Sequence, residues 1–193
     1  MSEAAIDSHS VIARNDSESH MGHMMHVPVA SWGERTFTGT RANVRLLKPA
    51  YDNDRLVVSG AVTGGTMRVE CHNDACALLA PMSLEAWRGD LEPIEPVGKR
   101  PPTERDEIAT SNLHVGLEVP AFVTKPDLDT HLGLCEAIGD TNALYFDGAN
   151  PCVHPLWTFR ECNAAFTRTW TMPVWIHVGS EITWMHPVRV GDE

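Results

Sequence analysis

Residues 44–54 read VRLLKPAYDND, and residues 182–192 read ITWMHPVRVGD. Pro49 and Pro187 are each the sixth residue of these stretches and interrupt the apolar runs there. An aspartate follows each proline by five residues. A segment with helical spacing and Met, Trp or Phe side chains precedes each run. Self-similarity at one fixed offset, here 138 residues, indicates an internal duplication. The sequence therefore predicts two copies of one unit.

The first copy combines one helix with short alternating strands. Apolar residues recur at helical spacing near the N-terminus, where Pro28 should kink or restart the helix and Gly33 should end it. Period-two alternation and turn residues at Gly64-Gly65 and Asn73-Asp74 then predict an antiparallel run. The expected elements are a helix over 19–37 and strands over 43–51, 55–63, 67–72 and 76–84, with a further strand-like stretch over 10–13.

A proline-rich segment separates the copies. The chain is expected to divide into a first unit over 1–87, a linker over 88–112 and a second unit over 113–193. Asp127 is an expected helix N-cap, and Gly139 is expected to end that helix. The expected elements of the second unit are a strand over 117–123, helices over 128–138 and 156–170, and strands over 174–178 and 181–190, with Gly179 between the last two.

The second copy is the shorter one. The first copy continues for 37 residues from Pro49 to Ala86, whereas six residues follow Pro187. About 31 residues are therefore expected to be absent from the second unit, which predicts a truncated reading frame. The alternative is a second unit that is naturally short. An unpaired apolar strand promotes association, so poor solubility or assembly with a partner is expected.

Composition excludes several classes of protein. The formal net charge is −11, and the 15 Lys and Arg residues are scattered, which argues against binding to nucleic acid. No apolar run approaches the ~20 residues needed to span a bilayer. Five cysteines without an apolar leader segment predict a reduced, cytoplasmic protein. Cys71 and Cys76 flank a predicted hairpin turn, and we expect two buried thiols there.

Residues 137–145 read AIGDTNALY and resemble the Asp-x-Asn-Pro-x-His signature of the MaoC-like (R)-specific enoyl-CoA hydratase/dehydratase family. Asp140 and Asn142 match this signature, Ala143 stands at the proline, and Tyr145 stands at the histidine. Stretches 176–181 and 186–192 are similar to the second strand of that family and its turn. The resemblance implies an α+β fold of tandem hot-dog units, in which an antiparallel sheet wraps around a central helix.

The resemblance also implies an activity. The family adds or removes water at acyl-CoA or acyl-carrier thioesters without a cofactor, and an Asp/His pair shares the acid and base work. It implies pairing of hot-dog sheets in homo- or hetero-dimers. If active, the chain is a hydro-lyase. The alternatives are a non-catalytic hot-dog subunit that pairs with an active partner, and a hot-dog thioesterase.

Particular residues follow from the resemblance. The implied catalytic residues of the second unit are Asp140, Asn142 and Tyr145, and a tyrosine at the histidine position is typical of a degenerate unit. In the first unit, His20 follows Asn15 and Ser17 at a spacing similar to the signature. The implied substrate-binding residues are His154, Gly179 and Ser180.

Histidines at positions 20, 23 and 26 lie roughly along one helical face. A zinc site needs tetrahedral nitrogen and sulfur ligands, and no fixed fourth partner accompanies these three. The sequence therefore predicts a histidine-rich, partly exposed helix and no metal site.

Overall fold

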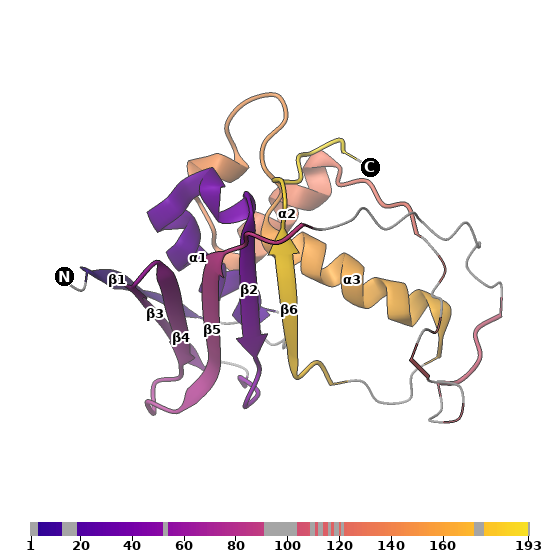
Figure 1. The fold of residues 1–193 in the computed structure, drawn as a ribbon, viewed down its shortest axis with the longest axis horizontal. Helices are drawn as coiled ribbons and strands as arrows, with labels where there is room; N and C mark the ends of the chain where they lie inside the picture. The colour runs from indigo at the N-terminus through magenta and orange to yellow at the C-terminus, as the bar shows by residue number, and fades with distance from the viewer. Residues whose placement is uncertain are drawn as a thin grey trace.

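The computed structural model shows six antiparallel strands in one sheet, with helix α1 (Ser19–Trp32) behind it (Figure 1). The strand order is β1-β3-β4-β5-β2-β6. This α+β arrangement of an antiparallel sheet and a central helix is consistent with a hot-dog fold. The strands are β1 (Ala4–Ile12), β2 (Thr40–Arg45), β3 (Arg55–Thr63), β4 (Thr66–His72), β5 (Leu78–Ala86) and β6 (Gly179–Trp184).

The structure describes most, but not all, of the chain. No helix in the described part is long and apolar enough to cross a membrane. The expected linker and the expected strand over 117–123 lie largely outside the described residues. The described residues are 4–12, 19–51, 54–90, 104–108, 111, 114–115, 117, 120, 122–171 and 176–192.

Helix α1 is buried on nearly every side. Met21, Met24, Met25 and Val29 are at most 2% exposed, and His20 and His23 are 1% and 3% exposed. The expectation of a partly exposed helix is therefore wrong for this stretch. A helix that is buried on most sides belongs in a core, and α1 packs against β3 and β4. The helix runs through Pro28 without a restart, which corrects part of the sequence expectation. Its α-helical part ends before Gly33, as expected, and a 3₁₀ turn η1 (Gly33–Phe37) follows.

Strand β2 lies inside the sheet, between β5 and β6. Its buried residues alternate with partly or fully exposed ones, so Thr40, Ala42 and Val44 face the core. The sequence places this strand at 43–51, which is wrong, because the chain leaves the sheet after Arg45. The N–H groups of Leu46 and Leu47 still donate to the carbonyls of Val178 and Leu79, but the regular ladder ends at Arg45.

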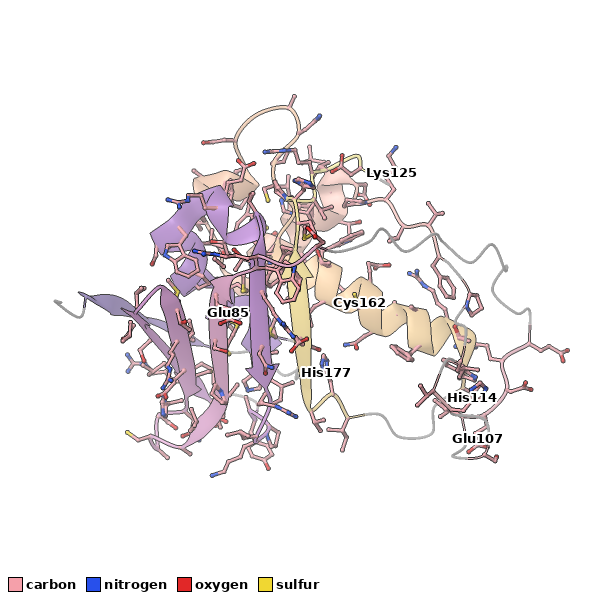
Figure 2. The ribbon with its side chains drawn as sticks, in the orientation of Figure 1. Glu85, Glu107, His114, Lys125, Cys162 and His177 are labelled. Carbon is pink, nitrogen blue, oxygen red and sulfur yellow. The ribbon has the colours of Figure 1, made fainter. Side chains whose placement is uncertain are left out.

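The second half of the described chain contributes helices α2 (Leu128–Ile138) and α3 (Pro155–Thr169) and a 3₁₀ turn η3 (Ala143–Tyr145). The bounds of α2 and its caps at Asp127 and Gly139 are confirmed. The ring of His177 connects α3 to the start of β6 (Figure 2): it stacks on Phe159 with ring centroids 5.7 Å apart and lies 3.1 Å from the side-chain nitrogen of Asn163.

Three sequence expectations differ from the structure. The last strand is continuous over Gly179–Trp184, so Gly179 begins a strand rather than separating two. Strand β5 begins at Leu78 and not at Cys76, because residues 73–77 form the hairpin turn. Cys76 lies in that turn with a φ of 59° and is exposed, whereas Cys71 is buried. The expectation of two buried thiols is therefore wrong for Cys76.

Candidate functional site

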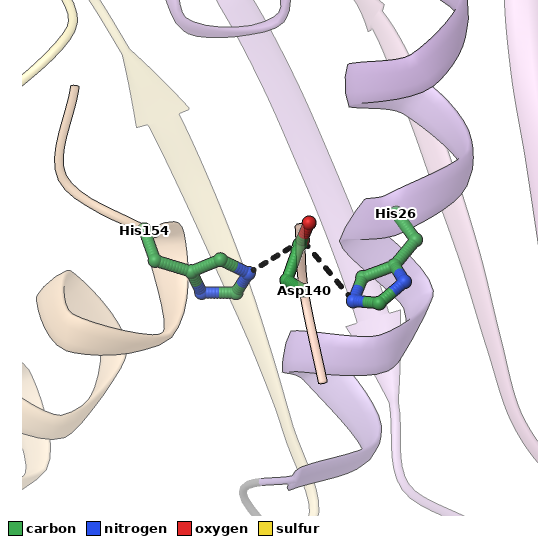
Figure 3. Close-up of side chains that lie close together, drawn as sticks. All are labelled: His26, Asp140 and His154. Atoms are coloured by element: carbon green, nitrogen blue, oxygen red, sulfur yellow. Dashed lines mark ion pairs between the residues drawn. The ribbon is translucent and has the colours of Figure 1, made fainter. Parts of the chain in front are cut away.

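Two imidazole rings converge on one carboxylate where α1, the end of α2 and the start of α3 meet (Figure 3). Oδ2 of Asp140 lies 3.1 Å from Nε2 of His26 and 3.3 Å from Nε2 of His154. The side chains are 5%, 10% and 0% exposed for Asp140, His26 and His154. A carboxylate this far from water is expected only where ionic or hydrogen-bonding partners surround it. These three residues are called the Asp140 cluster below.

The end of α2 sets the direction of Asp140. Gly139 adopts the left-handed conformation with a φ of 67°, and its N–H donates to Glu136, which terminates the helix. The N–H of Asp140 then donates to the carbonyl of Cys135 at 2.9 Å. Oδ1 of Asp140 accepts the N–H of Asn142 at 2.9 Å. One carboxylate oxygen is therefore fixed by the backbone, and the other faces the two rings.

Helix α3 fixes the tautomer of His154. This residue is the N-cap, and its Nδ1 accepts the N–H of Leu156 at 3.1 Å, with Pro155 at the first helical position. Because Nδ1 accepts, the neutral ring carries its proton on Nε2. This nitrogen lies 3.3 Å from Oδ2 of Asp140, an ion-pair distance at which the geometry of a hydrogen bond is not met. The same capping bond that starts α3 therefore sets the protonated nitrogen of His154 beside Asp140.

A further buried histidine supports this arrangement. Nε2 of His131 lies 2.9 Å from the carbonyl oxygen of Tyr145, which only accepts, so Nε2 carries the proton. Nδ1 of His131 is then free to accept the N–H of His154, at 3.5 Å. The side chain is 0% exposed on α2. His131 thus holds η3 and the start of α3 in place.

Close packing brings α1 to the cluster. A Cβ on Gly22 would lie 3.0 Å from Cδ2 of Leu156 and 3.7 Å from Cε1 of His154. A larger residue there would push α1 away from the start of α3. Gly22 therefore lets the two helices approach, and His26 follows it by about one turn on α1.

Burial and hydrogen bonding set the charges. Burial alone would raise the pKa of Asp140, but the close contact with His154, the charge of His26 and the N–H of Asn142 outweigh it and lower that pKa. Burial lowers the pKa of His154 despite the opposing contact with Asp140. Burial, together with its histidine neighbours, lowers the pKa of His23 to about 4. At neutral pH an ionised Asp140 therefore faces a neutral His154.

The donor set of the cluster also bears on metal binding. The three ligand atoms lie within 4.8 Å of one another, and two imidazoles with a carboxylate form a known ligand set for divalent metals. A metal-binding imidazole, however, presents a lone pair to the ion and donates its other N–H to an acceptor. His154 has the opposite arrangement, since Nδ1 accepts from Leu156. The geometry favours proton exchange with Asp140 over metal ligation.

Tyr145 contacts the cluster without joining it. Its side chain is fully buried and its ring centroid lies 4.8 Å from that of His154. Its hydroxyl has no hydrogen-bond partner among the described residues. Burial, and to a lesser degree the charge of Asp140, raises its pKa well above the ordinary value. Tyr145 is therefore a packing surface for His154 in this structure, and an imidazole reaches Asp140 from two other elements.

The remaining residues implied by the resemblance are dispersed. Oδ1 of Asn142 accepts the N–H of Leu144 at 3.0 Å and caps η3. His20 is 1% exposed in the first turn of α1, and residues 13–18, including Asn15 and Ser17, lie outside the described part of the chain. A Cβ on Gly179 would lie 2.6 Å from the carbonyl oxygen of Val44, so this glycine permits the pairing of β2 with β6. Oγ of Ser180 lies 2.6 Å from Nε2 of His177.

The sequence indicated Asp140 and His154 as site residues with separate roles. It did not indicate His26 or His131 as site residues. The signal for His131 was present, because it shares the buried face of α2 with Leu134, Cys135 and Ile138. His26 was visible as one of three histidines spaced by three. Only the packing of α1 against α3 shows which of them reaches Asp140.

The fold is an α+β arrangement consistent with a hot-dog fold, and it holds a buried Asp/His group beside its central helix. No protein-family model matches the sequence. No curated protein matches it either. A solved structure described as "MaoC-like dehydratase" is similar, with a TM-score of 0.46, 12% sequence identity, and coverage of 86% of this chain and 77% of that one.

Proposed function

We propose that this chain is a hydro-lyase of the hot-dog class that adds water to, or removes it from, an acyl thioester at the Asp140 cluster. One observation carries the proposal: His26 and His154 both direct ring nitrogens at one ionised carboxylate. Addition of water across an enoyl double bond needs a base for the water proton and an acid for the α-carbon. An Asp/His group with a fixed tautomer supplies both.

The roles follow from burial and tautomer. His154 is fully buried and holds its protonated Nε2 3.3 Å from Asp140, so it acts as a positioning residue that keeps the carboxylate ionised. Asp140 orients His26, the least buried member of the cluster and therefore the ring nearest to entering substrate. In the hydration direction the water gives one proton to the cluster, its oxygen bonds to the β-carbon, and the cluster returns one proton to the α-carbon. The thioester itself is unchanged.

The internal duplication belongs to the same proposal. Helix α1 shifted by 138 residues covers 157–170, and β2 shifted likewise covers 178–183. These ranges nearly coincide with α3 and β6. The two strands pair antiparallel, and Asn43, which pairs with Glu181, stands 138 residues before it. The pairing is therefore symmetric about residues that the duplication makes equivalent, which supports two related units with the Asp140 cluster between helices α1 and α3.

A second candidate is a non-catalytic hot-dog subunit. The enclosure of the cluster favours it, because Asp140 is 5% and His154 0% exposed and a substrate needs access to the reacting group. In that case the cluster would hold the helices together, and acyl-thioester chemistry would belong to a partner with a complete site. Pairing through the sheet edge at β6 is the expected mode.

The decisive experiment is hydration of crotonyl-CoA, followed by loss of enoyl absorbance, on purified soluble protein. Asp140→Asn and His26→Gln are expected to lower kcat at least about a hundredfold. The exposed Asp147, seven residues after Asp140, provides the control Asp147→Asn, which should retain full activity.

The same assay separates the alternatives. Release of free coenzyme A thiol, dependent on Asp140, would indicate a thioesterase instead. A folded wild-type protein without activity, confirmed by circular dichroism, would reject the hydro-lyase and leave the non-catalytic subunit. Activity that survives both cluster substitutions would place the reacting group elsewhere.

A further inference from the structure

A cleft lies beyond the C-terminal end of α1, away from the Asp140 cluster on the same helix. Its volume is about 380 Å³, which is within the usual range for small-ligand sites. Trp32, Arg35 and Thr40 line it from α1, η1 and β2, and Val62 and Ala86 line it from β3 and β5. Gly65, which has a positive φ of 89°, contributes only backbone atoms to the lining of the cleft.

The charge in the cleft comes from one residue. Arg35 is the charged side chain in its lining. The neighbouring acid, Glu34, forms an ion pair with Arg189, so it does not neutralise Arg35. No carboxylate forms an ion pair with Arg35 within the described ranges of the chain. In a protein of net charge −11, a guanidinium that has no ion-pair partner among the described residues and lies at an apolar wall is a local positive site.

The other polar groups in the lining are largely occupied. The hydroxyl of Thr40 donates to the carbonyl of Arg35 at 3.3 Å, and the hydroxyl of Thr38 donates to that of Glu34 at 3.5 Å. These bonds hold the turn between η1 and β2 and orient the segment that carries Arg35. Trp32, Val62 and Ala86 provide the apolar surface. The cleft therefore offers one cation beside an aromatic and aliphatic wall.

We infer that this cleft binds a small organic monoanion, a carboxylate with a short apolar tail. A guanidinium receives a carboxylate through two parallel N–H bonds, and the tail covers Trp32, Val62 and Ala86. A single cation matches a single negative charge better than it matches a nucleotide with several phosphate charges. The inference does not rest on the proposed function, because no residue of the cleft belongs to the Asp140 cluster.

The test uses hexanoate as the probe and nuclear magnetic resonance of the tryptophan indole N–H groups as the readout. The chain has six tryptophans, and Trp32→Phe identifies the Trp32 signal by its loss. Hexanoate at millimolar concentration should shift this signal in a saturable way. Arg35→Gln should weaken binding about tenfold or more. Arg68→Gln is the matched control, since Arg68 is exposed on β4 and likewise forms no ion pair with any described residue.

The neutral amide of the same shape, hexanamide, separates charge from apolar contact. Hexanamide should bind at least about tenfold more weakly than hexanoate to the wild type. Equal binding of the two would overturn the proposal. So would an unshifted Trp32 signal, equal effects of Arg35→Gln and Arg68→Gln, or tighter binding of adenosine 3′,5′-bisphosphate than of hexanoate.

Discussion

Nε2 of His154 and Oδ2 of Asp140 lie 3.3 Å apart, and the bond that caps α3 decides which of the two carries the proton. Because Leu156 donates to Nδ1, the neutral ring carries its proton on Nε2. The start of a helix therefore sets the state of a buried carboxylate that follows a different helix. The stability of the fold and the chemistry proposed for the cluster depend on the same contact.

Removing the carboxylate should destabilise the protein strongly. Asp140→Ala leaves two buried imidazoles without their common acceptor, and we expect a loss of about 3 kcal/mol in the free energy of unfolding. Urea denaturation measures it. Asp147→Ala, at an exposed position of the same loop, should change that free energy by less than about 0.5 kcal/mol. Similar values for the two variants would contradict the role given to Asp140.

Stability should fall as the pH is lowered from about 6.5 to about 4. The pKa of His23 is lowered from 6.5 to about 4 by burial, and that of His154 is also lowered. The unfolded chain therefore takes up protons first, and the stability present above pH 6.5 is lost as the pH falls toward the folded pKa. Asp140, whose pKa is lowered from 3.8, adds a further loss below that value.

Thermal unfolding at a series of pH values checks this dependence. His23→Phe removes one titrating ring at a position that is 3% exposed and should flatten the slope between pH 6.5 and 4. An unchanged slope in this variant would show that His23 does not contribute to the acid sensitivity.

His131 should act through the position of His154. His131→Phe keeps a ring in the buried space but leaves the carbonyl of Tyr145 and the N–H of His154 without their partner. We expect a loss of about 1–3 kcal/mol in the free energy of unfolding. The His154 imidazole resonances should shift in the same variant. Thr130→Val, one residue earlier and exposed, is the comparison, and a loss limited to its N-cap contacts is expected there.

The hydroxyl of Tyr145 should be dispensable. It is buried without a hydrogen-bond partner among the described residues, so Tyr145→Phe should be neutral or slightly stabilising. Tyr145→Ala, which also removes the stack on His154, should cost about 3–5 kcal/mol. If Tyr145→Phe retained stability but lost crotonyl-CoA hydration, the hydroxyl would have a chemical role that its surroundings do not indicate.

Substitution of Gly179 distinguishes a packing role of this residue from a substrate-binding role. Gly179→Ala would place a Cβ 2.6 Å from the carbonyl oxygen of Val44, and we expect a loss of about 1–3 kcal/mol from the β2–β6 pairing. Ser180→Ala, the next residue, should leave the pairing intact. A stable Gly179→Ala protein with a raised KM for an acyl thioester would favour the substrate-binding role implied by the resemblance.

Local signals were sufficient for many of the elements. Asp127 and Gly139 marked the ends of α2 because an N-cap carboxylate and a left-handed glycine act within one turn. Strand β3 was placed correctly by its alternation and the glycines after it. The predicted bounds of strand β2 were wrong, because an apolar pattern does not show where pairing with a neighbouring strand ends. The prediction of a buried thiol at Cys76 was wrong for a related reason. The exposure of this residue depends on the bounds of a turn that the alternation pattern did not show.

The sequence by itself determined the α+β class, the caps of α2 and the presence of Asp140 at the end of that helix. Each depends on interactions within a few residues. Only the tertiary structure decided that the partner of Asp140 on another element is the imidazole of His26 and not the side chain of Tyr145. It also decided that His154 faces the same carboxylate oxygen. These contacts join residues 14 and 114 positions apart, and their formation depends on how closely α1 approaches α3 at Gly22. Packing of this kind is a property of the whole core, so no local pattern could specify it.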